Sequence, residues 1–124
     1  MIELTKAEVQ VMQYLWNIEK GFLKDIIEQY PEPRPAYTTV STVVRVLVKK
    51  KAISFNTYGK INEYYPLIKK SDYTKKYMST LVQNFFNNSP KQFASFFTKE
   101  SDLSVSELEE LKTLIDQQIS EKQK

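Results

Sequence analysis

The pattern of apolar and polar positions is clearest between residues 35 and 51, where it predicts an amphipathic helix. Apolar residues recur there at the spacing of a helix face that packs on a core: Val40, Val43, Val44 and Leu47. The opposite face combines short hydroxyls with cations and holds no acid: Thr38, Thr42, Arg45 and Lys49, with Ser41 on its flank. A plain solvent-facing side usually mixes Glu with Lys. Hydroxyls beside cations suit base edges and phosphates, so the stretch is predicted to be a DNA-recognition helix.

A strand is the alternative for the same stretch, because eight of its seventeen residues are β-branched and favour an extended backbone. Strict alternation fails at Val43-Val44, however, and a fully buried strand would not carry Arg45 in its middle. We therefore expect tertiary packing to hold these residues in a helix against their local preference.

Two shorter helices are predicted upstream of this stretch. Thr5 and Glu8 form a capping box that opens the first helix, and Gly21 is expected to end it. Its buried face is predicted to consist of Val9, Met12, Leu15 and Trp16. The second helix covers residues 22–30 and ends at the prolines of residues 31–35, which lack amide donors. The three helices together predict a helix-turn-helix arrangement.

After residue 51 the apolar pattern changes to a period of two residues, which indicates strands. Residues 52–57 and 61–67 flank a turn in which Gly59 can adopt the positive φ of a tight hairpin. As the wing of a winged helix, this hairpin is expected to place Tyr58 and Lys60 against the DNA. A plain surface loop at the turn is the alternative.

Three further helices are predicted in the C-terminal part of the chain. The first begins at Ser71 and ends near Phe86, and Pro90 opens a short second helix. A capping box of Ser104 and Glu107 opens the last one, which is expected to fray from Ser120 onwards. The predicted fold class is therefore mainly α with a small β-hairpin. It comprises a winged helix-turn-helix DNA-binding domain at residues 1–70 and a three-helix dimerisation lobe at residues 71–124.

The C-terminal helices carry more large apolar side chains than about fifty residues can bury. The resulting exposed apolar surface usually marks an interface, and twofold self-association is the commonest arrangement. The expected dimer interface consists of Tyr77, Leu81, Phe85, Phe86, Phe93, Phe96, Phe97, Leu108, Leu111 and Ile115. A core shared only within one chain is the competing interpretation.

Charge and composition narrow the functional classes. Residues 1–70 carry 11 Lys or Arg and 7 Asp or Glu, whereas residues 71–124 carry 7 and 8, so the positive charge lies in the first part. Between Pro33 and Asn62 there are six cations and no acid, which favours a polyanionic partner over a merely solvated face. The chain has no Cys and no His, so thiolate or imidazole metal sites are excluded and an enzyme is disfavoured. We expect no cofactor, no metal, no membrane span and a cytoplasmic location.

With these segments placed, the chain resembles the penicillinase/methicillin repressor family (BlaI/MecI type) along nearly its full length. The resemblance is carried by the order and spacing of short pieces, the main ones being Leu4-Thr5-Lys6-Ala7-Glu8, Leu15-Trp16, Ala36-Tyr37-Thr38-Thr39-Val40, Lys49-Lys50, Tyr64-Tyr65-Pro66, Ser89-Pro90 and Glu107-Leu108-Glu109-Glu110-Leu111. It implies a homodimeric winged-helix repressor with DNA contacts at Thr38, Thr39, Ser41, Thr42 and the wing.

Three positions depart from the family pattern. Val46 stands where family members have Arg, so Arg45 is expected to take over that phosphate contact. Lys51 replaces the usual Gly after the lysine pair, which removes the expected helix cap. In antibiotic-responsive members a sensor or protease pathway cuts an Asn-Phe bond. Phe96-Phe97 occupies the matching position here, so the resemblance leaves induction by cleavage open.

We hypothesise a homodimeric repressor that binds a near-palindromic operator in double-stranded DNA. The expected DNA-binding residues are Arg34, Tyr37, Thr38, Thr39, Ser41, Thr42, Arg45, Lys49, Lys50, Tyr58 and Lys60. The first alternative is a winged-helix protein-interaction or anti-repressor module that does not bind DNA, since fold alone does not establish function. The second is a small-molecule-responsive regulator with its pocket in the aromatic C-terminal lobe.

Overall fold

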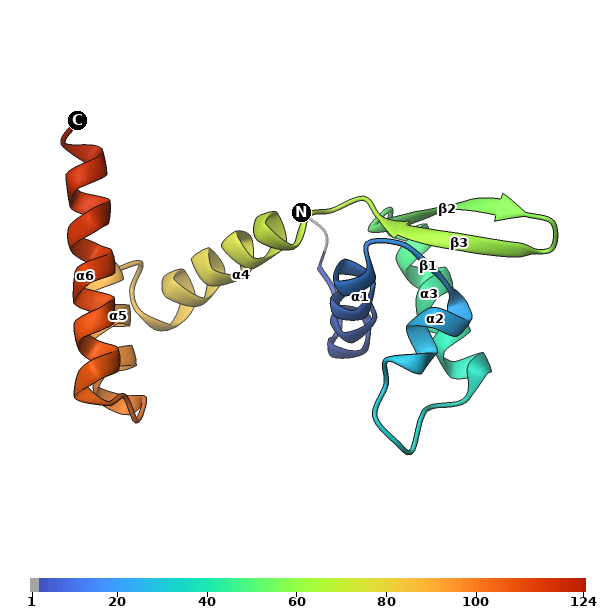
Figure 1. Cartoon of the computed structure of the whole chain (residues 1–124), viewed down its shortest axis with the longest axis horizontal. Helices are drawn as coiled ribbons and strands as arrows, with labels where there is room; N and C mark the ends of the chain where they lie inside the picture. Colours follow the sequence, from blue (N-terminus) through green and yellow to red (C-terminus); the bar gives the residue numbers. More distant parts are fainter. Residues whose placement is uncertain (1–2) are drawn as a thin grey trace. The chain divides into compact units, whose positions relative to one another are not determined.

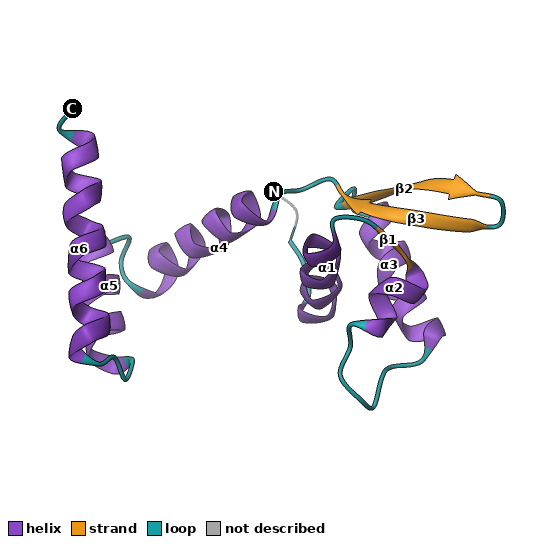
Figure 2. Ribbon diagram, viewed as in Figure 1, coloured by secondary structure: helices purple, strands orange, loops and turns teal. Residues whose placement is uncertain are grey.

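The computed structural model describes residues 3–124 and contains two compact units, the first ending at Lys75 and the second beginning at Lys76. The elements in chain order are α1 (Lys6–Ile18), β1 (Gly21–Phe22), α2 (Leu23–Glu28), α3 (Tyr37–Lys49), β2 (Ile53–Tyr58), β3 (Ile61–Pro66), α4 (Lys70–Phe85), α5 (Pro90–Glu100) and α6 (Val105–Lys122) (Figure 1). Most residues are helical and the strands form one small antiparallel sheet (Figure 2). The predicted fold class is confirmed, and the unit boundary lies inside α4, shortly after the predicted residue 70.

α3 is a regular helix, so the helix prediction is confirmed and the strand alternative is wrong. Val40, Val44 and Leu47 are buried on its inner face, as the spacing predicted. Packing of this face against α1 and α2 overrides the strand preference of the β-branched residues.

The C-terminal end of α3 keeps its cap although glycine is absent. Lys51 adopts a φ of 64° and donates its backbone N–H to the Val48 carbonyl at 3.0 Å. The N–H of Ala52 donates to the Leu47 carbonyl, also at 3.0 Å, which completes a Schellman motif. The expectation that Lys51 removes the cap is therefore wrong, because the buried Ala52 beyond it holds the turn in place.

α1 begins with the predicted capping box but ends earlier than expected. Thr5 and Glu8 exchange the two expected hydrogen bonds, at 2.9 and 3.2 Å. The helix ends at Ile18, and Glu19 rather than Gly21 has the positive φ, at 72°. The inner face buries Val11 in place of Val9, and Trp16 is half-buried, with its Nε1 donating to the Ile68 carbonyl at 2.9 Å.

Gly21 belongs to a short strand that the sequence pattern did not reveal. β1 pairs antiparallel with β3, Gly21 opposite Tyr64, so the sheet order is β1-β3-β2. A Cβ on Gly21 would lie 2.6 Å from Cδ1 of Ile18, so any larger residue here would have to displace the end of that side chain. Phe22 consequently lies in β1, and α2 begins one residue later than predicted.

The wing is present as predicted. β2 and β3 pair from Ile53 opposite Pro66 to Tyr58 opposite Ile61, and Gly59 has a φ of 63° in the turn. The hairpin extends beyond the helices of the first unit (Figure 1). Its base is anchored in the core, which consists of Val11, Met12, Leu15, Ile26, Val40, Val44, Leu47, Ala52 and Ile53.

The second unit contains the end of α4 together with α5 and α6. Asn87 and Asn88, both with positive φ, separate α4 from α5, and Pro90 opens α5 behind the Ser89 cap, as predicted. Ser71 lies inside α4 instead of capping it, and α6 continues to Lys122 instead of fraying at Ser120. No residue of α4, α5 or α6 is buried. No helix within residues 3–124 is long and apolar enough to cross a bilayer.

Candidate nucleic-acid interface

The outer face of α3 presents hydroxyls and cations to solvent. Val40, Val44 and Leu47 dock the helix on the core, and this fixes which side faces outward. The residues predicted for DNA contact on α3 are exposed apart from the half-buried Ser41: Tyr37, Thr38, Thr39, Ser41, Thr42, Arg45 and Lys49. Because residues 34–61 contain no acid, no acidic side chain of this segment offsets the charges of Arg45 and Lys49 on this face.

Thr42 has a restricted side chain on this face. Its Oγ1 donates a hydrogen bond to the Thr38 carbonyl one turn earlier, at 2.9 Å. The hydroxyl proton is therefore used within the helix, and the side chain offers an approaching ligand its methyl group and the oxygen lone pairs. A thymine methyl or a base-edge donor fits these groups.

Arg34 lies at the proline-rich loop and is engaged by its own chain. Its Nε donates to the Tyr30 carbonyl at 3.1 Å and its Nη2 donates to the Glu28 carbonyl at 3.0 Å. Nη1 forms an ion pair with Oε1 of Glu32 at 3.1 Å. The guanidinium thus closes the end of α2, and we leave it out of the phosphate-binding set.

Lys50 is likewise engaged within the first unit. Its Nζ lies 2.6 Å from Oε1 of Glu8 and donates to the Glu3 carbonyl at 3.1 Å. Glu8 is only 6% exposed. Burial by itself raises the pKa of Glu8, but the hydrogen bonds from Lys50 and the Thr5 amide outweigh it, so the pKa of this carboxyl lies below its usual value. Sequence reasoning missed Glu8 as a partner of Lys50, because 42 positions separate them.

The wing places its two predicted residues in solvent. Tyr58 is more than half exposed, and its ring packs edge-on against Phe22 with centroids 6.3 Å apart. Lys60 is exposed in the turn beside Gly59. The hairpin therefore presents an aromatic hydroxyl and a cation at its tip.

The predicted dimer residues divide into two groups in the second unit. Leu81, Phe86, Phe93 and Leu111 are half-buried, and Phe86 lies 5.5 Å from Phe93 and 5.4 Å from Phe96 between ring centroids. The others remain exposed: Tyr77, Phe85, Phe96, Phe97, Leu108 and Ile115. The prediction omitted Met78, Leu114 and Ile119, which are exposed on the same helices.

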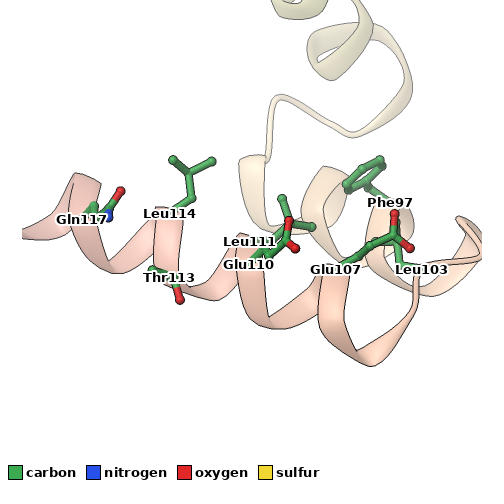
Figure 3. Close-up of a pocket in the computed structure, with 8 residues that line it drawn as sticks. All are labelled: Phe97, Leu103, Glu107, Glu110, Leu111, Thr113, Leu114 and Gln117. Carbon is green, nitrogen blue, oxygen red and sulfur yellow. The ribbon is translucent and has the colours of Figure 1, made fainter.

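A groove of about 450 Å³ lies between α5 and α6 in this unit. Phe97 faces it from α5, and Leu111 and Leu114 project from α6 on the same side (Figure 3). Glu107 and Glu110 stand among the apolar lining residues. Among residues 3–124 no cluster of acidic side chains is arranged to hold a metal ion.

Comparison with known proteins identifies relatives over most of the chain. The family model described as penicillinase repressor matches residues 4–117. The methicillin resistance regulatory protein MecI of Mammaliicoccus sciuri is 28% identical over 91% of this chain and 93% of its own length. The penicillinase repressor of Bacillus licheniformis is 23% identical over 93% and 91%. Among solved structures, the DNA-binding domain of the repressor BlaI is 26% identical, with a TM-score of 0.51 over 57% of this chain and 88% of that domain.

Proposed function

The chain belongs to the penicillinase repressor family of DNA-binding repressors, and we propose that two copies of it bind one near-palindromic operator. The observation that carries DNA binding in this proposal is the acid-free outer face of α3, where the hydroxyls of the first turns are followed by the exposed cations Arg45 and Lys49. Its relatives are transcriptional repressors and not enzymes.

The contacts of α3 divide into two kinds. Thr38, Thr39, Ser41 and Thr42 read base edges and thymine methyls, because their side chains are short enough for close approach. Arg45 and Lys49 neutralise the phosphates next to these bases, and Tyr37 at the start of the helix contacts the DNA backbone. On the wing, Lys60 and Tyr58 contact the neighbouring phosphates or the minor groove.

Dimerisation through the second unit gives the complex its twofold symmetry. The second unit of each copy leaves apolar side chains such as Phe85, Phe96 and Ile115 in solvent. In the dimer, the second unit of the other copy covers them. Two recognition helices related by a twofold axis then meet half-sites about one turn of DNA, ~34 Å, apart.

The test uses the chain and a duplex selected by it from a random library. Replacing Thr42 by Ala removes the methyl and the oxygen, so we expect binding to the selected duplex to fall by roughly tenfold with little change on random DNA. Replacing Lys49 by Ala removes one phosphate contact from each of the two copies, so both affinities fall together and the salt slope of the dimer decreases by about 1.8. Fluorescence anisotropy at several salt concentrations measures both effects.

Two experimental results would contradict this proposal. Equal losses on selected and random DNA for the Thr42 variant would refute the division between base and phosphate contacts. No enrichment of a palindrome in the library selection would refute the twofold operator.

A further inference from the structure

We propose that Lys50, together with Glu8, is a positioning pair that holds α3 in its DNA-reading orientation and does not touch DNA itself. This inference rests on the proposed function and assigns a structural role to Lys50, which the sequence analysis expected to contact DNA. It separates Lys50 from its neighbour Lys49, although the two side chains are chemically identical.

The pair joins the start of α1 to the end of α3. Lys50 is the C-cap residue of α3, and Glu8 is the third residue of α1. Oε1 of Glu8 accepts from both the Thr5 amide, at 2.9 Å, and Lys50 Nζ, at 2.6 Å. Nζ also donates to the Glu3 carbonyl, so one ammonium group ties together the cap of α1 and the chain before it.

No other ion pair within residues 3–124 joins two elements of the fold. Arg34 pairs with Glu32 inside one loop, and Lys124 pairs with Glu121 one turn away. The Glu8–Lys50 pair is also the least exposed of the three, since the Glu8 side chain is 8% exposed and that of Lys50 33%. A charged hydrogen bond in these surroundings is strong and directional.

Apolar packing by itself leaves the orientation of α3 less closely defined. Val40, Val44 and Leu47 bury their surface against α1, but the hydrophobic effect has no preferred direction and tolerates small slides and rotations. A short ion pair at the end of the helix restricts such movements. Because Thr38 and Thr42 project from the same helix, their positions relative to the wing depend on this restriction.

Lys50 is expected to remain paired with Glu8 when the protein binds DNA. If Nζ moved to a phosphate, the buried Glu8 carboxylate would lose its cation, which is unfavourable. Lys49 has no such constraint, since it is exposed and forms no ion pair or side-chain hydrogen bond with another described residue. The adjacent lysines therefore form a matched pair, one free for phosphate and one held by the protein.

The test compares Lys50→Met, Lys49→Met, Glu8→Gln and the double variant Glu8→Gln/Lys50→Met on the library-selected duplex. For Lys49→Met we expect the slope of log affinity against log salt to fall by about 1.8, because each of the two copies loses one phosphate contact. For Lys50→Met we expect roughly fivefold weaker binding with an unchanged slope. The double variant should bind about as Lys50→Met does, because either single change breaks the same pair.

Glu8→Gln is the most discriminating variant. It makes the chain more positive, so electrostatic attraction alone predicts tighter binding to DNA. The positioning role predicts the opposite, a loss of roughly threefold to fivefold, similar to that of Lys50→Met. Lys50→Arg keeps the charge and the reach to Glu8 and should bind within about twofold of the unmodified chain. Circular dichroism at the assay temperature selects the conditions in which every variant is folded.

The outcomes are separable. A salt slope that falls for Lys50→Met as it does for Lys49→Met would overturn the inference, because it identifies Lys50 as a phosphate contact. Unchanged or tighter binding by Glu8→Gln would overturn it as well. If the unmodified chain bound no duplex at all, the proposed function would fail and this inference with it, whereas the first two results leave the proposed function intact.

Discussion

In the first unit Met12, Leu15 and Leu47 are completely buried, whereas in the second unit Phe85 is 74% exposed and Ile115 58%. Both units have amphipathic helices of comparable length, so helix formation does not distinguish them. The units differ in whether their elements enclose a core. In the first unit α1, α2, α3 and the sheet surround a common core. The helices of the second unit pack through a few aromatic rings and leave the rest in solvent. The first unit thus closes its core within a single chain, whereas the second leaves the exposed apolar surface that the proposed dimer would cover.

The same contrast holds for a single motif present in both units. Thr5 with Glu8 and Ser104 with Glu107 form capping boxes of nearly equal geometry, with amide-to-carboxylate distances of 2.9 and 3.0 Å. Glu8 is buried and bound by Lys50, whereas Glu107 is exposed and bound only by the Ser104 cap. Identical local sequence signals therefore acquire different importance from their surroundings.

The largest expected effect is on the free energy of unfolding, and it compares a residue of the closed core in the first unit with a partly exposed residue in the second. Leu47→Ala should lower the free energy of unfolding by about 3 kcal/mol at every protein concentration, because it creates a cavity within one chain. Leu114 is half exposed, so Leu114→Ala should destabilise only through the dimer, and its cost should depend on protein concentration. Urea unfolding at two widely separated concentrations measures both. A concentration-independent loss of similar size for Leu114→Ala would contradict the contrast between the units.

A charge on the exposed face of the second unit should separate the two copies. Ile115→Asp is expected to weaken self-association by roughly a hundredfold, since a carboxylate would be buried in an apolar interface. Ile61 in the wing is the matched control, because it is 57% exposed and Ile115 is 58% exposed. Ile61→Asp should leave the dimer unchanged. Sedimentation equilibrium gives both dissociation constants, and equal weakening by the two variants would contradict an interface in the second unit.

The smallest expected effect concerns the two capping-box glutamates in acid. The pKa of each lies below the ordinary 4.5, so each carboxylate stabilises the fold above that pH and loses this contribution as the pH falls through the folded-state value. Glu8→Gln should cost on the order of 1–2 kcal/mol at neutral pH and flatten the loss of stability below pH 4.5. Glu107→Gln should change the profile less, because Glu107 is exposed and lacks a cation. Unfolding curves recorded from neutral pH into acid compare the two, and a larger effect at Glu107 would contradict the contrast.

Features that depend on neighbouring residues could be read from the sequence. The capping boxes, the positive φ of Gly59 and the proline at the start of α5 are where the pattern places them. The helical state of α3 also followed from its apolar spacing, although its β-branched residues favour strands. The exposed hydroxyl face of that helix was predicted on the same grounds.

Features that depend on distant residues were missed or misjudged. β1 exists because Gly21 reaches Tyr64, and the strand is too short to leave a pattern. Lys51 was expected to remove a helix cap, yet burial of Ala52 keeps the turn. Arg34 and Lys50 were counted as free cations on charge alone, and only the fold reveals the carbonyls and the carboxylate that engage them.

The sequence by itself determined the six helices and the hairpin, the acid-free face of α3 and the surplus of apolar side chains after residue 70. These follow from the period of the pattern and from residue type, both of which are local. The tertiary structure decided which lysine of an identical pair is free, which glutamate is buried and which apolar side chains remain uncovered. Those properties depend on what a side chain meets across the fold, and the energy of a charge or an apolar group is set by these surroundings.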